Sequence, residues 1–164
     1  MSSLTVALVL HASLLGAGGN NYTDAHRETV ETGKPLLVMV GADWCGPCQQ
    51  MKKTILPQVG KHGLLDHVAF AHVNAEKESE LARKLTGGGP VPQLVMLRKT
   101  DDGWRKRKLI GGQSVDTVEK FIRETVVQNQ KDHAAKSGAA TARKTDRSAD
   151  ADDDKIDARP VSSH

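Results

Sequence analysis

The chain has 164 residues, of which 38% are hydrophobic, 26% are charged and only 3% are aromatic, and its formal net charge at pH 7 is +3. This length suits one domain of ordinary size, whose core is built mainly from aliphatic side chains. The small net charge gives no argument for binding nucleic acid. Both cysteines lie in one short motif, so neither is left for a separate structural disulfide, and cysteine usage does not fix the compartment.

The first nineteen residues form an apolar N-terminal segment. Its apolar run 4–10 is followed by the small residues 16–19, a pattern typical of a secretory signal and its cleavage region. The stretch is interrupted by His11 and Ser13 and is too short to span a membrane comfortably. We therefore expect residues 1–19 to be a signal peptide and the protein to be periplasmic or otherwise extracytoplasmic. The alternative is a cytoplasmic protein in which this segment is a β-strand of the domain, since no Lys or Arg precedes the apolar run.

Alternating helices and strands are predicted between residues 20 and 130, which we interpret as one domain. The first helix has Asn21 or Thr23 as its cap. The next element is a strand of continuous apolar character, which indicates burial on both faces. Pro57 is expected to kink or end the helix that follows the cysteine motif. The predicted elements are a helix over 22–32, a strand over 35–41, a helix from 49, a strand over 67–74, a helix over 76–85, strands over 93–99 and 104–110, and a helix from 114.

Two charged segments have no predicted role in chemistry. Arg and Lys alternate over 105–108 within a predicted strand, which indicates an edge strand protected against aggregation. After about residue 130 the composition changes to Ala, Ser, Lys, Arg and Asp with few large aliphatic residues. Such a segment buries too little apolar surface to offset its chain entropy, so we expect a disordered charged tail over 131–164.

The most informative motif is Trp44-Cys45-Gly46-Pro47-Cys48. An apolar strand precedes it and a helix follows it, so Cys45 is placed near a helix N-terminus, where the dipole and free N–H groups stabilise a thiolate. A thiolate of low pKa beside a second thiol is the machinery of thiol–disulfide exchange. A zinc site is the weaker interpretation, because the motif supplies two of the four ligands needed and no compact histidine pair supplies the others; no metal site is expected.

The motif in this context resembles the active site of the thioredoxin family. Val91-Pro92, just before the apolar run 94–97, resembles the family's cis-proline, and Gly111-Gly112 resembles its glycine after the final strand. The resemblance covers about residues 22–128. It implies a thioredoxin-like α/β fold with a central mixed β-sheet flanked by helices.

The resemblance also implies a function and the roles of individual residues. Cys45 is expected to be the exposed nucleophile, and Cys48 the more buried resolving cysteine of one redox-active disulfide. The expected function is reduction of protein disulfides by a monomer without a bound cofactor, with electrons from an upstream thiol donor that is thioredoxin-reductase-like or a membrane dithiol. The alternatives are an exported thiol oxidase or isomerase, or a redox-inert binding module. The implied substrate-binding residues are Trp44, Gly46, Pro47, Val91 and Pro92.

One departure from the family concerns proton transfer to and from Cys48. Many thioredoxins carry a buried aspartate where this chain has Met39, and the lysine that commonly accompanies it is replaced by His72. Asp43 is expected to face solvent. The general base is therefore open: His72 is a candidate, although a lone strand histidine is more often structural.

Overall fold

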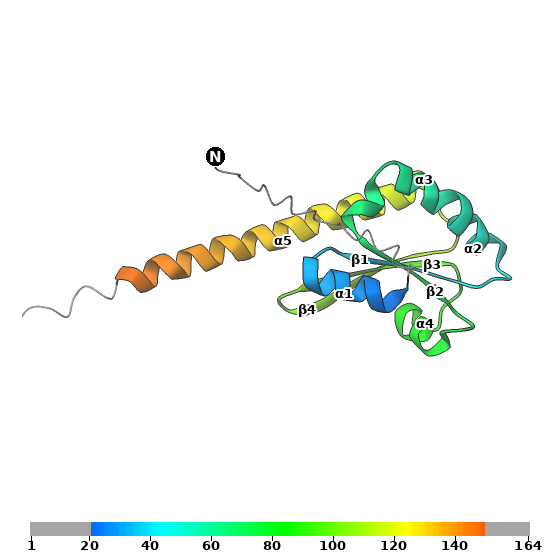
Figure 1. The fold of residues 1–164 in the computed structure, drawn as a ribbon, viewed down its shortest axis with the longest axis horizontal. Helices are drawn as coiled ribbons and strands as arrows, with labels where there is room; N and C mark the ends of the chain where they lie inside the picture. The colour runs from blue at the N-terminus through cyan, green and yellow to red at the C-terminus, as the bar shows by residue number, and fades with distance from the viewer. Residues whose placement is uncertain (1–20, 150–164) are drawn as a thin grey trace, which may run out of the picture.

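A computed structural model describes residues 21–149, and one four-stranded mixed sheet lies at its centre, with the strand order β2-β1-β3-β4 (Figure 1). The two central strands run antiparallel to each other, while β1 and β2 are parallel and β3 and β4 form a hairpin. The strands are β1 (Leu36–Gly41), β2 (Ala69–Asn74), β3 (Gln93–Thr100) and β4 (Gly103–Ile110). This arrangement confirms the expected thioredoxin-like α/β fold. The apolar segment over 1–19 lies outside the described residues.

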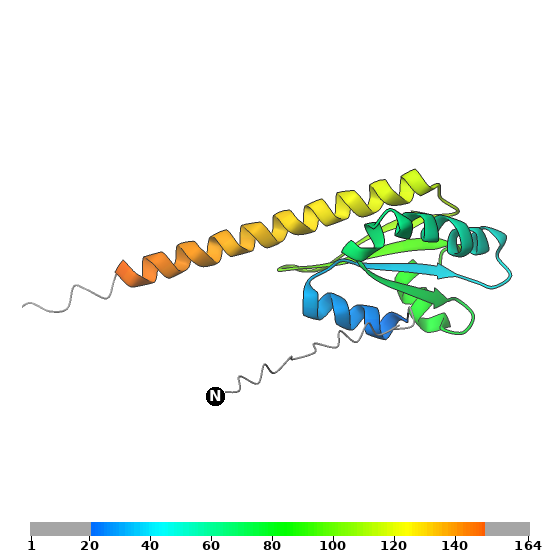
Figure 2. The same cartoon turned by 45° about the horizontal axis from the view of Figure 1, so that its top comes forward.

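Helices cover both faces of the sheet (Figure 2). Successive side chains of a strand point to opposite faces. Leu37 and Met39 of β1 therefore pack with the cysteine-motif helices and α5, whereas Leu36 and Val38 pack with α1 and α4. Every β1 residue is buried, which confirms the prediction from its continuous apolar character. The helices are α1 (Tyr22–Thr32), α2 (Gly46–Gln50), η1 (Met51–Ile55), α3 (Leu56–Lys61), η2 (Leu64–His67), α4 (Ser79–Thr86) and α5 (Val115–Ala149).

The helix after the cysteine motif passes through Pro57 without ending there. Its middle section η1 is a π-helical turn, in which the N–H of Leu56 donates to the carbonyl of Met51, five residues back. Proline has no N–H to donate to the carbonyl four residues earlier, and a single π turn is a common way to accommodate such an interruption. The π turn holds one residue more than an α-helical turn, so it changes which side chains of this helix face the core. Leu56 is buried with Met51 and Val59, while Ile55 is only partly buried.

The last helix is longer than the sequence suggests. Where a disordered tail is expected from residue 131, helical backbone continues to Ala149 and projects beyond the sheet (Figure 1). Two contacts fix its course past residue 128: the Asn129 side-chain amide donates to the Gly33 carbonyl at 2.9 Å, and Asp132 pairs with Arg98 at 2.5 Å. Beyond them, alanine and long basic residues favour helix, and no proline interrupts them. The rest of the expected tail, 150–164, lies outside the described residues.

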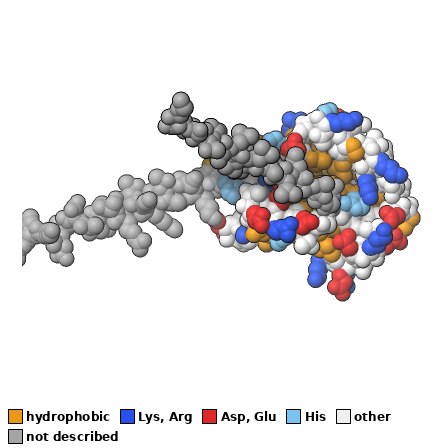
Figure 3. Space-filling model, viewed as in Figure 1, with side chains coloured by type: hydrophobic (Ala, Val, Ile, Leu, Met, Phe, Trp, Pro, Cys, Tyr) orange, Lys and Arg blue, Asp and Glu red, His pale blue; other side chains and the backbone are white. Residues whose placement is uncertain are grey.

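The alternating charges of β4 are used within the fold. As predicted, β4 is an edge strand. Lys108 Nζ donates to the Thr86 carbonyl at 2.8 Å, at the C-terminus of α4, where a cation is favoured. Arg107 points to the other face, where it lies over the Phe121 ring and donates to Glu124 at 3.0 Å. Charges of both signs are interspersed on the face of the domain seen in Figure 3.

No helix within 21–149 is long and apolar enough to cross a membrane.

Candidate active site

Cys45 and Cys48 lie where β1 ends and α2 begins, and they form a disulfide with a Cα–Cα separation of 5.2 Å. Cys45 is the N-cap of α2, and its sulfur accepts the backbone N–H of Cys48 at 3.3 Å. Pro47 lies in the first turn, where a missing N–H leaves no helical hydrogen bond unmade. When the disulfide is reduced, the same N–H and the helix dipole favour the thiolate form of Cys45.

The two cysteines differ more in their neighbours than in their exposure. In the disulfide form both are buried, with 5% of Cys45 and 3% of Cys48 exposed, so the expected contrast in burial is small. Cys45 nevertheless lies between Trp44, which is 72% exposed, and the exposed Gly46. The assignment of Cys45 as the nucleophile stays a prediction, and its exposed neighbours are consistent with it.

The segment at Val91-Pro92 lies beside Cys45. The peptide bond between these two residues is cis, as predicted, and Pro92 is buried. The Val91 carbonyl oxygen is 3.9 Å from Cys45 Sγ. Residues 46 positions apart in the chain thus form one site, with the backbone of Val91 next to the sulfur that an incoming disulfide would meet.

A third segment borders the site on the side of β4. The N–H of Gly111 donates to the Pro92 carbonyl at 2.8 Å, and Gly112 lies against Pro47, since a Cβ at Gly112 would be 3.6 Å from the Pro47 Cβ. Ile110, just before these glycines, is 55% exposed. The two glycines were predicted from the sequence, but Ile110 was not. The alternation of side chains along a charged strand does not show which apolar residue stays exposed to solvent.

The space beneath Cys48 is apolar. Met39 is fully buried and belongs to the same core cluster as the two cysteines. A Cβ placed on Gly41 would be 3.2 Å from Met39 Cε and 3.2 Å from Cys48 Sγ, so both side chains pack closely against Gly41. An apolar side chain of the same core cluster as Cys48 thus occupies the sequence position where many family members carry a carboxylate.

His72 lies one strand away on the same side of the sheet. It is the register partner of Met39, and aligned residues of parallel strands point to the same face. Burial, and next the positive charge of Lys52, lower the pKa of His72, while Asp43 and Glu78 oppose this shift. The lowered pKa favours the neutral form of the ring at pH 7. The cavity that His72 lines has a volume of about 400 Å³ and is also bordered by Lys52, Leu56, Pro57, Leu65 and Phe70.

Asp43 faces solvent, as expected. Its side chain is more than half exposed, and its carboxylate is 3.5 Å from Lys77 Nζ. Its backbone carbonyl accepts the Gln49 side-chain amide at 3.1 Å. Asp43 therefore contributes charge near His72 but is not buried under the cysteines.

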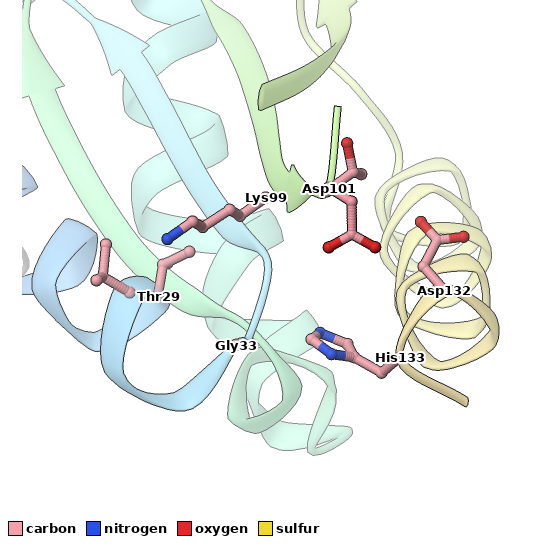
Figure 4. A pocket seen from close by; sticks show the side chains of 8 residues that line it. Thr29, Gly33, Lys99, Asp101, Asp132 and His133 are labelled. Carbon is pink, nitrogen blue, oxygen red and sulfur yellow. The ribbon is translucent and has the colours of Figure 1, made fainter. Parts of the chain in front are cut away.

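A second pocket lies at the opposite end of the sheet (Figure 4). It has a volume of about 230 Å³ and lies between α1, the β3–β4 hairpin and α5, near Gly33, whereas Cys45 follows the other end of β1. Asp132 already pairs there with Arg98. Across residues 21–149, no group of three His, Cys, Asp or Glu side chains is arranged to hold a metal ion. The Cys45–Cys48 disulfide lies at the other end of the sheet from this pocket.

Comparison with known proteins agrees with this geometry. Residues 20–124, more than half of the chain, match the family model described as Thioredoxin. The chain belongs to the thioredoxin family. With the Cys45–Cys48 pair at the head of α2, it is a thiol–disulfide oxidoreductase.

Individual relatives in this family are moderately similar. A thioredoxin from Alicyclobacillus acidocaldarius subsp. acidocaldarius is 30% identical over 98 residues, which cover 59% of this chain and 88% of that protein. The chloroplastic thioredoxin M4 of Arabidopsis thaliana is 29% identical over 110 residues, covering 66% of this chain and 54% of that protein. The solution structure of a Thermus thermophilus thioredoxin superposes with a TM-score of 0.59 and 25% identity, covering 66% of this chain and 86% of that chain. The chain thus holds a thioredoxin-family domain, and its last helix continues past the matched residues to Ala149.

Proposed function

We propose that this oxidoreductase works as a protein-disulfide reductase. The Cys45 thiolate attacks one sulfur of a substrate disulfide, and the other substrate sulfur leaves as a thiolate that takes up a proton. The Cys48 thiol then loses its proton and attacks Cys45, which releases the second substrate sulfur and forms the Cys45–Cys48 disulfide. Two electrons pass from the protein to the substrate. The observation that carries this proposal is the position of Cys45 as the cap of α2, with the Cys48 N–H on its sulfur.

The reducing direction is supported by the residues between the cysteines. Gly46 and Pro47 place no charged side chain between the two sulfurs. In the family this dipeptide accompanies reducing proteins, with potentials of about −270 mV for thioredoxin against about −120 mV for the oxidant DsbA. An exported oxidase or isomerase is the alternative. Equilibration of Cys45 and Cys48 with dithiothreitol redox buffers separates the two, because a potential near that of DsbA would exclude the reductase.

The substrate is proposed to be an extended protein segment. Trp44 and Ile110 are exposed near Cys45, and the backbone of Val91 borders the sulfur. Extended peptides bind such sites through backbone hydrogen bonds and side-chain pockets. We propose that oxidised protein is reduced again by an upstream thiol donor, either thioredoxin-reductase-like or a membrane dithiol.

Reduction of insulin with dithiothreitol as the electron source tests the activity. Wild type is expected to accelerate precipitation of the insulin B chain, and Cys45→Ser is expected to abolish the acceleration. A redox-inert binding module would give the dithiothreitol background rate in both cases, and that result would overturn the proposed function.

We also propose an extracytoplasmic location, which rests on the apolar segment and small residues of 1–19 alone. In that setting a membrane dithiol would be the natural donor, whereas a cytoplasmic protein would use a thioredoxin-reductase-like donor.

A further inference from the structure

A buried polar side chain without a complete set of partners lies directly after the cis-proline. Gln93 is fully buried, and its side-chain oxygen Oε1 is the one buried side-chain N or O atom of the described residues that has no hydrogen-bond partner. Burying an acceptor without a partner is unfavourable, and an apolar side chain of similar size would remove that loss. The presence of glutamine here therefore calls for an explanation other than stability.

The other end of the Gln93 amide holds the loop that leads to the cis-proline. Its Nε2 donates to the Pro90 carbonyl at 2.9 Å. The amide also packs against Gly89, where a Cβ would be only 2.8 Å from Nε2. Gly89 is thus required for this close approach and not for an unusual backbone angle. The contact ties Gln93 to the two residues that precede Val91.

The loop has a second attachment at its start. The Thr86 hydroxyl accepts the N–H of Gly88 at 3.2 Å and donates to the Ala82 carbonyl at 2.7 Å. Gly87 and Gly88 have left-handed backbone angles, and because glycine has no side chain, these two residues add no side-chain packing to the turn. The Val91 carbonyl, 3.9 Å from Cys45 Sγ, thus lies between the Pro90 carbonyl, which accepts from the Gln93 amide, and the Pro92 carbonyl, which accepts from Gly111.

We propose that Gln93 is a positioning residue, which holds the Pro90-Val91 backbone beside Cys45 so that a substrate strand can dock there. This inference rests on the proposed reductase function, because that function supplies the substrate. Gln93 is fully buried and acts through Val91, so it does not touch the substrate itself. Its contribution should appear in the recognition of protein disulfides and not in the exchange chemistry of Cys45.

The variant Gln93→Met tests this inference, because it keeps the side-chain length and removes the amide. We expect the KM for insulin to rise about fivefold, the ratio that corresponds to the loss of one neutral hydrogen bond. The kcat, and the rate with the small disulfide 5,5′-dithiobis(2-nitrobenzoate), should change by less than about twofold because neither needs the docked loop. The matched control is Asn129→Leu, which also removes a buried amide from a loop carbonyl, that of Gly33, at the opposite end of β1. The control should leave the KM for insulin and the rate with 5,5′-dithiobis(2-nitrobenzoate) unchanged.

A second variant and a second readout make the test independent of folding defects and of activity. Gly89→Ala places a methyl against the Gln93 amide without removing any buried group, and it should raise the insulin KM in the same direction. In both variants, amide hydrogen exchange over 87–91 should accelerate about tenfold while exchange in α5 stays unchanged.

The outcomes separate the two proposals. If wild type fails to reduce insulin, the reductase function falls, and the hydrogen exchange of Gln93→Met still decides whether Gln93 holds the loop. If wild type is active but both variants keep the wild-type KM and the wild-type loop exchange, the positioning role of Gln93 is overturned. A KM increase of equal size in Asn129→Leu would overturn it as well.

Discussion

Met39 and Cys48 both pack against Gly41: the methionine Cε and the cysteine Sγ each lie 3.2 Å from the position that a Cβ on Gly41 would occupy. Met39 is fully buried and apolar, so it cannot accept the proton that Cys48 must lose before it attacks the mixed disulfide. Resolution of the mixed disulfide, and not the first attack, is therefore expected to limit the rate.

The substitution Met39→Asp should supply the missing base. We expect steady-state insulin reduction at pH 7 to rise roughly tenfold, less than the about 10²- to 10⁴-fold that a well-positioned base contributes. Stability should fall by about 2–4 kcal/mol, because a carboxyl group without designed partners is buried. The control Met39→Leu keeps the site apolar and should leave the rate unchanged. A folded Met39→Asp protein with the wild-type rate would mean that another group already accepts the proton.

His72 is the candidate for that other group, and its burial predicts a pH dependence. The pKa of His72 is lowered in the folded state, first by burial and next by Lys52. An unfolded histidine with its ordinary pKa of about 6.5 therefore binds more protons than the folded one, so stability falls as pH drops below about 7 and levels off below the folded pKa. In His72→Gln this part of the pH dependence of the denaturation midpoint should disappear.

The exposed His67 provides the matched control for His72. His67→Gln should keep the wild-type dependence of stability on pH over the same range, since His67 is exposed. If His72 accepts the proton of Cys48, His72→Gln should slow insulin reduction several-fold. An unchanged rate in His72→Gln would leave His72 with a structural role only.

Strong local patterns made the fold and the centre of the site predictable. The continuous apolar run of β1, the cysteine motif at a strand-to-helix junction and the Val91-Pro92 pair each carry their information within a few residues, and the structure confirms the buried strand, the helix cap and the cis peptide bond.

Features that depend on contacts between distant segments were not predictable in the same way. The course of α5 past residue 128 depends on Asn129 and Asp132 meeting Gly33 and Arg98, which are far away in the chain. The role of Gln93 depends on the loop that folds back over it. A glutamine in an apolar run gives no sign of this, because the pattern shows burial but not which carbonyl lies opposite.

The order of attack by the two cysteines can be tested by trapping. If Cys45 attacks first, Cys48→Ser should accumulate a stable mixed disulfide with a protein substrate, because no resolving thiol remains. Cys45→Ser should accumulate none, since Cys48 lies within α2 and is expected to act only on the mixed disulfide formed at Cys45. Non-reducing electrophoresis of the two variants after mixing with oxidised substrate measures both. Equal trapping by the two variants would contradict the assignment of Cys45 as the nucleophile.

The N-terminus of the mature protein tests the predicted signal peptide, and α1 gives the test a structural reference point. Asn21 is the N-cap of α1, and its side chain accepts the N–H of Asp24 at 2.9 Å. Loss of such a cap costs about 1 kcal/mol. Cleavage after residue 19 or 20 would keep the cap, so N-terminal sequencing of protein from an exporting host should give a start at Asn20 or Asn21. A soluble cytosolic product that still begins with Met1 would reject export and favour the alternative, in which residues 1–19 contribute a strand to the domain.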